Sequence, residues 1–201
     1  MALKVKAELE NGADFSALAL TYSDDPSAKM NKGDLGYFTG LQMVQQFEEA
    51  AYTLPVGSIS DPILTDFGYH IIQVSGRQAN PGEVQVSHIL VRFDSENPSQ
   101  EENARRKISD IYAEIQKEST IWEEIVQTYS EDFGTKSAGG VLPWFGVGTM
   151  IPEFEVAGFS LTDIGEVSPP IKTAYGYHIL RLEGKRGLEP YEEVEQSIRS
   201  K

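Results

Sequence analysis

The sequence contains no cysteine and is poor in histidine and in basic residues. Because none of its 201 residues is cysteine, disulfides, thiolate nucleophiles and cysteine-based zinc sites are excluded. It has 17 Lys and Arg against 31 Asp and Glu, a net charge of −14, and nucleic-acid binding needs the opposite, clustered basic side chains. No apolar run approaches the roughly 18 residues of a membrane span. The composition is otherwise that of a globular protein, 40% hydrophobic.

The few histidines reveal an internal repeat. Of the three, two end near-identical pentapeptides, "DFGYH" at His70 and "AYGYH" at His178. The blocks before them align at an offset of 107 residues, and the aligned pairs include Met43 with Met150 and Phe47 with Phe154. A period of this length is too long for a solenoid unit, so it predicts two tandem domains.

The third histidine bears on the domain boundaries. We predict a first copy over 1–80, a second over 81–187, and the start of a further helix or a tail over 188–201. A counterpart of His88 would fall ahead of residue 1, so the first copy is expected to lack its opening strand. Both ends of the chain resemble cuts in a longer protein. The incomplete copy would then leave a gap or borrow a strand from a neighbouring molecule.

The second copy has the pattern of an α+β domain. "EVQVSHILVRF" predicts a strand, and Ser99 with Glu102 forms a capping box ahead of a helix. "TIWEEIVQTYS" predicts a second helix, and a short strand is expected near 142–145. Pro152 can open a third helix, and two strands are expected around Gly176. The resulting order, β-α-α-β-α-β-β, is α+β rather than doubly wound.

Strand parity places two of the histidines on sheet faces. In the opening strand His88 shares a face with Val86 and Leu90, and in the last strand His178 shares one with Leu180. If these two strands are adjacent, the two imidazoles come within hydrogen-bonding distance. The simpler interpretation is that each is an ordinary buried histidine with satisfied hydrogen bonds.

Four blocks carry a resemblance to a known family. In order, "VSHILV", "YSED", "GGVLPWFGVGTMIPEF" and "KTAYGYHILRL" resemble the blocks of the parvulin-type (rotamase, PpiC-like) peptidyl-prolyl cis–trans isomerases. The resemblance covers nearly all of 84–185, and the first copy up to about Gln78. It implies two tandem parvulin-like domains, each a small, mostly antiparallel four-stranded sheet covered by helices.

The resemblance also implies a site, with no metal and no cofactor. Its catalytic positions match His88, Asp132, Thr173 and His178. Its substrate-binding positions match Leu142, Met150 and Phe154. The first-copy equivalents are Asp25, Leu35, Met43, Phe47, Thr65 and His70. The second copy departs from the pattern at Val141, Pro143 and Ile151, where the first copy has Asp34, Gly36 and Val44.

The chemistry of prolyl isomerisation suits these residues. An X-Pro bond rotates over a barrier of roughly 18–20 kcal/mol without any bond breaking, so a catalyst must favour the twisted amide by differential binding. An apolar notch can anchor the pyrrolidine ring, and a histidine–aspartate network can tune the polarity beside the carbonyl. Without the resemblance, Leu142, Met150 and Phe154 would be taken as core, and Asp132 as a turn residue.

The resemblance implies isomerase activity on unfolded or exported polypeptides, in the second copy and not in the first. Arg92 stands alone among acids in the loop after the first strand, so no preference for a phosphorylated residue before proline is expected. Tandem copies resemble bacterial cell-envelope foldases and chaperones, which implies a periplasmic or envelope location and proline-containing unfolded chains as partners. The alternative, motivated by Pro143, is a non-catalytic peptide-binding chaperone module. The sequence does not predict an oligomeric state.

Overall fold

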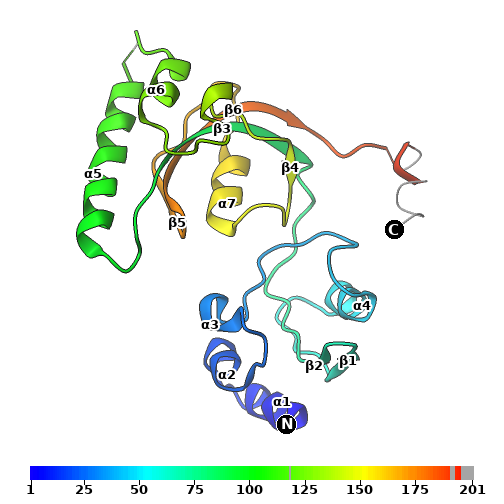
Figure 1. Cartoon of the computed structure of the whole chain (residues 1–201). Helices are drawn as coiled ribbons and strands as arrows, with labels where there is room; N and C mark the ends of the chain where they lie inside the picture. The colour runs from blue at the N-terminus through cyan, green and yellow to red at the C-terminus, as the bar shows by residue number, and fades with distance from the viewer. Residues whose placement is uncertain (118, 191–192, 196–201) are drawn as a thin grey trace. The chain divides into compact units, whose positions relative to one another are not determined.

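The fold is described from a computed structural model, which covers residues 1–117, 119–190 and 193–195. The chain forms two compact units, one mainly of Met1–Asn80 and one of Pro81–Val194 (Figure 1). Within the described ranges no helix is long and apolar enough to cross a membrane. The helix or tail predicted over 188–201 falls largely outside them, because residues 191–192 and 196–201 are not described.

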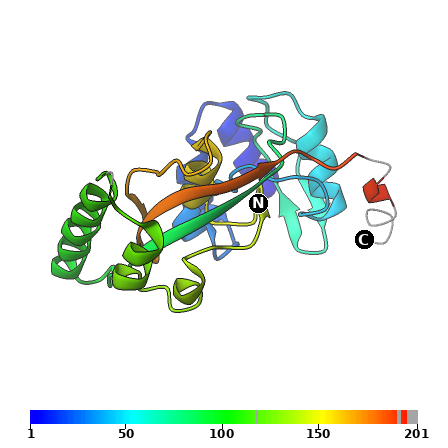
Figure 2. The ribbon, with the colours of Figure 1, turned by 90° about the horizontal axis from the view of Figure 1, so that it is seen from above.

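The second unit has the predicted order of elements and is an α+β domain. Its elements are β3 (Glu83–Val91), α5 (Pro98–Ile115), α6 (Trp122–Tyr129), a short 3₁₀ turn (Lys136–Ala138), β4 (Phe145–Gly146), α7 (Pro152–Ser160), β5 (Ile171–Thr173) and β6 (Gly176–Arg186). The four strands form one antiparallel sheet in the order β4-β3-β6-β5. β3 and β6 therefore lie side by side at its centre (Figure 2).

Two apolar clusters cover the two faces of this sheet. Alternate residues of the central strands, Ile89 and Ile179 among them, pack under α5 and α6. The others, such as Val86 and Leu180, pack with Phe154 of α7. This division follows from the two-residue period of a strand, and it places α7 on the face that carries the two histidines.

The start of α5 corrects a prediction. The helix begins at Pro98, and its cap is Asn97, whose side chain accepts a hydrogen bond from the N–H of Gln100. The predicted capping box at Ser99 and Glu102 is therefore wrong. Asn is as good a cap as Ser, and Pro98 fits the first helical position because its missing N–H would have no partner there. Together they start the helix earlier than Ser99 would.

The short strand between the 3₁₀ turn and α7 also lies later in the sequence than expected. It was predicted near 142–145, but β4 is Phe145–Gly146 and pairs with Glu83 and Val84. Leu142 still contacts the sheet, since its N–H donates to the carbonyl of Val86 at 2.9 Å. Pro143 has no N–H to donate, which prevents a continuous ladder from Leu142 onward.

The first unit is a reduced version of the second. It consists of α1 (Ala2–Glu10), α2 (Phe15–Tyr22), α3 (Ala28–Asn31), α4 (Gln45–Thr53), β1 (Ile63–Thr65) and β2 (Gly68–His70). β1 and β2 form a two-stranded antiparallel sheet. They match β5 and the start of β6, so the four-stranded sheet expected of a complete copy is reduced to one hairpin.

The missing strand and the short first helix leave the first unit poorly covered. Tyr69 has 67% of its surface exposed, whereas its counterpart Tyr177 has 8%. Tyr177 packs with residues of α5, which has 18 residues against nine in α1. The buried hydrophobic residues that are described in this unit are Leu9, Ala28, Ile72 and Val74. Its core is therefore much smaller than that of the second unit.

Candidate active site

The two histidines of the second unit meet on one face of its sheet. β3 and β6 are antiparallel neighbours, with His88 opposite Leu180 and His178 opposite Leu90. The Nδ1 atoms of His88 and His178 lie 3.4 Å apart, and the ring centroids are 5.6 Å apart at an interplanar angle of 21°. Both side chains are buried, with 6% and 4% of their surface exposed. The prediction that the two imidazoles come within hydrogen-bonding distance is confirmed.

Each imidazole has a further polar partner at its outer nitrogen. Nε2 of His88 lies 2.8 Å from Oδ2 of Asp132, which also accepts a hydrogen bond from the hydroxyl of Thr135. Nε2 of His178 lies 2.8 Å from Oγ1 of Thr173. The result is one polar chain across the sheet: Thr135, Asp132, His88, His178 and Thr173.

The direction of these hydrogen bonds follows from the chemistry of Asp132. An ionised carboxylate only accepts, so His88 must donate from Nε2, and a neutral His88 must then accept at Nδ1. His178 consequently donates from Nδ1 and accepts at Nε2 from the hydroxyl of Thr173, which the carbonyl of Gly176 also approaches at 3.2 Å. This arrangement satisfies all four ring nitrogens with both imidazoles neutral.

The pKa values agree with that assignment. Burial, followed by the neighbouring His88, lowers the pKa of His178 to about 3. Burial also lowers the pKa of His88, although Asp132 opposes the change. Burial disfavours ionisation of Asp132, but hydrogen bonds from Thr135 and His88 outweigh it and leave the pKa of that carboxyl below its usual value. Near neutral pH the five side chains of this polar chain therefore carry a single negative charge, at Asp132.

The predicted apolar residues lie on the same face as the imidazoles. The ring of Phe154 stands edge-on to both, with centroid distances of 5.7 Å to His88 and 5.4 Å to His178. Phe154 has only 4% of its surface exposed. Leu142 and Met150 pack against the same cluster but are only partly buried. Phe154 is thus the floor of the site, and the other two keep surface that a ligand can contact.

Thr135 is a site residue that the sequence analysis missed. It lies three residues after Asp132 in the irregular turn that leads into the 3₁₀ segment. Its hydroxyl is 3.3 Å from Nε2 of His88 as well as bonded to Asp132. The available signal was a hydroxyl residue within one turn of the aspartate, in "DFGT". Such residues are common in turns, which makes the signal weak.

The first unit holds half of the corresponding arrangement. Oγ1 of Thr65 lies 2.7 Å from Nε2 of His70, and the ring of Phe47 stands edge-on to His70 at 5.6 Å. Asp25 is exposed and accepts instead from the N–H and hydroxyl of Ser27. Without the imidazole of an opening strand, the aspartate and His70 are not joined. Of the other equivalents, Leu35 is 42% exposed and Met43 is partly exposed.

Two departures from the family pattern, Val141 and Pro143, fall in the loop before β4, and the third, Ile151, is the N-cap of α7. Gly36 has a φ of +65° in the first unit, a value that proline cannot adopt because its ring fixes φ near −65°. The backbone at Pro143 therefore differs from that at Gly36, as expected from the sequence. Val141 forms an isolated bridge with Ser87, so this loop is still attached to β3.

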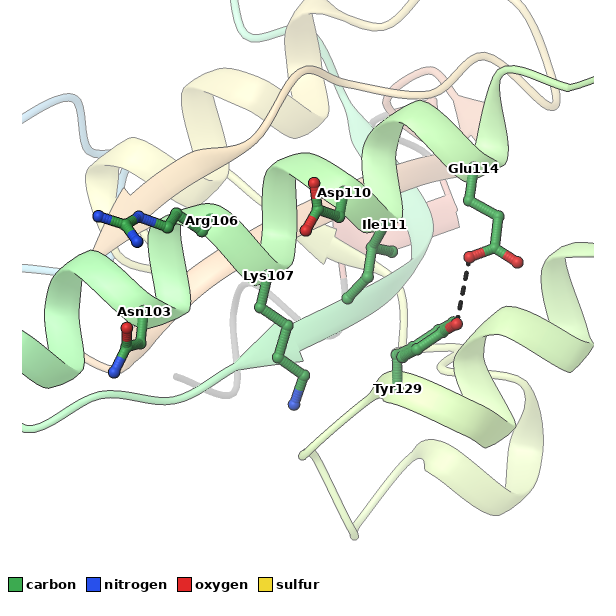
Figure 3. Close-up of a pocket in the computed structure, with 7 residues that line it drawn as sticks. All are labelled: Asn103, Arg106, Lys107, Asp110, Ile111, Glu114 and Tyr129. Atoms are coloured by element: carbon green, nitrogen blue, oxygen red, sulfur yellow. Dashed lines mark hydrogen bonds between the residues drawn. The ribbon is translucent and has the colours of Figure 1, made fainter.

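A shallow pocket of about 440 Å³ lies elsewhere, between α5 and α6 (Figure 3). Its lining includes Arg106, Lys107, Asp110 and Glu114, and Glu114 accepts a hydrogen bond from the hydroxyl of Tyr129 at 3.2 Å. These helices cover the face of the sheet opposite to the histidines. The pocket is therefore separate from the polar chain. Within the described ranges, no group of three or more His, Asp or Glu side chains is arranged to hold a metal ion.

Comparison with known families gives two matches along the chain. Residues 88–184 match a family described as a PPIC-type PPIASE domain, and residues 1–78 match a second family with the same description. Both matches lie within the two copies recognised from the repeat. Together they include every residue of the polar chain and its first-copy counterparts.

Individual relatives span most of this chain. A protein named chaperone SurA from Hahella chejuensis is 34% identical over 188 residues, which is 91% of this chain and 42% of the relative. The chaperone SurA of Chromohalobacter salexigens is 34% identical to this chain. The aligned region covers 89% of this chain and 42% of the length of the relative. The chain thus spans less than half the length of these curated relatives. Among solved structures, the peptidylprolyl isomerase PrsA of Bacillus cereus is 37% identical, with a TM-score of 0.45. The match covers 60% of this chain and 42% of the length of the PrsA chain.

Proposed function

The chain belongs to the parvulin family of PPIC-type peptidyl-prolyl isomerases, and we propose that its second domain, residues 81–187, isomerises X-Pro bonds in unfolded polypeptides. The observation that carries the proposal is the polar chain from Thr135 to Thr173 lying over the ring of Phe154. Such an arrangement provides an apolar floor and fixed polar groups in one place. The relatives named as chaperones and a peptidylprolyl isomerase support it.

The proposed mechanism is non-covalent. The chain has no cysteine, and Asp132 is engaged by His88 and Thr135, so no activated nucleophile stands in the site. The prolyl ring binds against Leu142, Met150 and Phe154. In that poorly hydrated position the amide carbonyl loses hydrogen bonds that favour the planar form, and its resonance becomes easier to break. The neutral imidazoles hold the polar surface in place without presenting a mobile charge.

We propose proline-containing segments of unfolded or exported proteins as substrates, without a phosphorylated residue before proline. Arg92, the basic residue of the loop after β3, donates from Nε to the carbonyl of Glu131, and its N–H donates to the Glu131 carboxylate. That carboxylate also pairs with Lys107. The guanidinium of Arg92 is thus engaged by the backbone carbonyl of Glu131 and the ammonium of Lys107 by its carboxylate, which disfavours a free phosphate site. We also propose a bacterial cell-envelope location, which the resemblance to tandem envelope foldases and chaperones implies.

A non-catalytic peptide-binding chaperone domain is the second candidate. The backbone departure at Pro143 favours it, because this loop also carries Leu142. Relatives covering most of the chain are named chaperones. The two functions share the binding of proline-containing peptides and differ only in whether the twisted amide is bound more tightly than the planar one.

Exchange spectroscopy on a short Ala-Pro peptide separates these candidates. The full chain is expected to accelerate cis–trans exchange, and Met150→Ala is expected to lower kcat/KM about tenfold or more, because loss of apolar contact in a pocket costs roughly 1–3 kcal/mol. Tight binding of the peptide with exchange at the uncatalysed rate would support the chaperone candidate instead.

The matched change in the first domain, Met43→Ala, tests whether that domain contributes. We expect no change in kcat/KM, because Asp25 and His70 are not joined there. A loss of activity comparable to that of Met150→Ala would show that the first domain is active.

A further inference from the structure

The loop between β4 and α7 carries Met150 and is held by a single carboxylate. Glu155, in the first turn of α7, accepts a hydrogen bond from the N–H of Gly148 at 2.8 Å. Burial raises the pKa of the Glu155 carboxyl, and the neighbouring backbone N–H groups of Gly148, Met150 and Thr149 oppose that rise. The N–H of Thr149 itself donates to the carbonyl of Gly146 at 3.3 Å. Three successive N–H groups thus lie near one carboxylate, and that of Gly148 donates to it. Hydrogen bonds to an ionised acceptor are roughly twice as strong as neutral ones, so this contact fixes the backbone from which the Met150 side chain projects.

The first domain contains the same arrangement 107 residues earlier. Glu48 of α4 accepts from the N–H groups of Gln42 and Met43, both at 2.9 Å, and the N–H of Leu41 also helps to lower the pKa of this carboxyl. Met43 is the counterpart of Met150. The arrangement therefore accompanies the methionine loop in both copies, including the copy whose polar chain is incomplete.

Backbone conformation shows that the loop geometry is enforced. Successive N–H groups point to one acceptor when a residue among them adopts a left-handed conformation. Gly148 has a φ of +77°, and its counterpart Leu41 has a φ of +68°. Glycine accepts this value freely, whereas a leucine there costs of order 1–2 kcal/mol. The first domain keeps the geometry in spite of that cost.

We propose that Glu155 is a positioning residue for substrate binding, which acts by holding the backbone of Met150 in the wall of the prolyl site. The inference rests on the proposed function of that site. Met150 is only partly buried, and a methionine side chain has three rotatable bonds. A fixed backbone reduces the freedom that the wall must lose when the proline ring binds. The identical role of Glu48 is expected to persist in the first domain, where it supports no activity.

The test is a double-mutant cycle between Glu155→Gln and Met150→Ala, with the full chain and an Ala-Pro peptide. Glutamine retains the size of the side chain but removes its negative charge, so its carbonyl oxygen can accept only the weaker hydrogen bonds of a neutral group. We expect Glu155→Gln to raise KM about tenfold with kcat changed less than twofold, since loss of pre-organised binding affects ground and transition states alike. In the Met150→Ala background the same change should have almost no further effect, because the two residues act as one unit.

Glu153→Gln is the matched control. Glu153 lies in the same turn of α7 and is exposed, so the KM of the Glu153→Gln variant should equal that of the wild type. Amide resonances provide a direct readout: Gly148, Thr149 and Met150 should shift in Glu155→Gln and not in the control. If the glutamine variant does not fold, Glu155→Asp, which withdraws the carboxylate by one methylene, takes its place in the cycle.

The outcomes separate this inference from the proposed function. Additive effects of the two substitutions, or equal KM values for Glu155→Gln and Glu153→Gln, would overturn the positioning role while leaving the isomerase proposal intact. If the wild type binds the peptide without accelerating exchange, the isomerase proposal fails, and the cycle is measured on Kd with the same expectations. A wild type that neither binds nor isomerises the peptide overturns both.

Discussion

Replacement of Phe154 by alanine is expected to lower the free energy of unfolding of the second domain by about 3–5 kcal/mol and to reduce isomerase activity to the background rate. The ring is buried among Val84, Val86 and Leu180, and it stands edge-on to both imidazoles. Its removal leaves a cavity beneath the polar chain. The histidines then lose the surface that fixes their ring orientation, and the proline loses its floor.

Phe159→Ala separates loss of stability from loss of the site. Phe159 lies on the same helix and packs against Phe145 at 6.1 Å, much as Phe154 does at 6.0 Å. We expect this variant to lose stability in urea unfolding but to retain the kcat/KM of its folded fraction. If both phenylalanine variants lose activity in proportion to their stability, Phe154 has no role in the site beyond packing.

A fall in pH from 6.5 to 4.5 is expected to destabilise the second domain by about 1.4 kcal/mol per pH unit for each histidine that remains neutral in the fold. The unfolded chain binds a proton at each such histidine near pH 6.5. Folded His178 remains neutral until the pH approaches about 3, and the pKa of His88 is also lowered. The unfolded state therefore binds more protons in this window, so stability rises with pH and is lost on acidification.

Urea unfolding at a series of pH values measures this slope, with His178→Gln as the control. Glutamine does not titrate, so the slope of the variant between pH 6.5 and 4.5 should be shallower by about 1.4 kcal/mol per unit. The carboxylates contribute equally to the slopes of the wild type and the variant. An unchanged slope would show that His178 is not held neutral. Ring resonances of His88 or His178 that titrate near pH 6.5 in the folded protein would show the same for that histidine.

The elements set by periodicity were predictable from the sequence. The alternation in β3 and β6 placed His88 and His178 on one face, and their register brought the rings together. Pro152 marked the start of α7. The repeat predicted two copies, and the two family matches fall within them. Each of these features depends on a regular spacing or on a residue with one strong backbone preference.

The features that were missed depend on irregular backbone. The turn that brings Thr135 to Asp132 has no sequence period, and the loop that presents three N–H groups to Glu155 depends on one left-handed residue. In the sequence, Glu155 looks like any acid in the first turn of a helix, where acids are common. The start of α5 was misplaced because two suitable caps, Asn97 and Ser99, compete within three residues.

The most direct test of the account is the position of a bound prolyl ring, measured by intermolecular NOEs between an Ala-Pro peptide and the full chain with labelled methyl groups. The account predicts NOEs from the prolyl ring to the methyl groups of Met150 and Leu142, with shifts in the ring resonances of His88 and His178. NOEs confined to the first domain, or shifts confined to Arg106 and Tyr129 in the α5–α6 pocket, would contradict it.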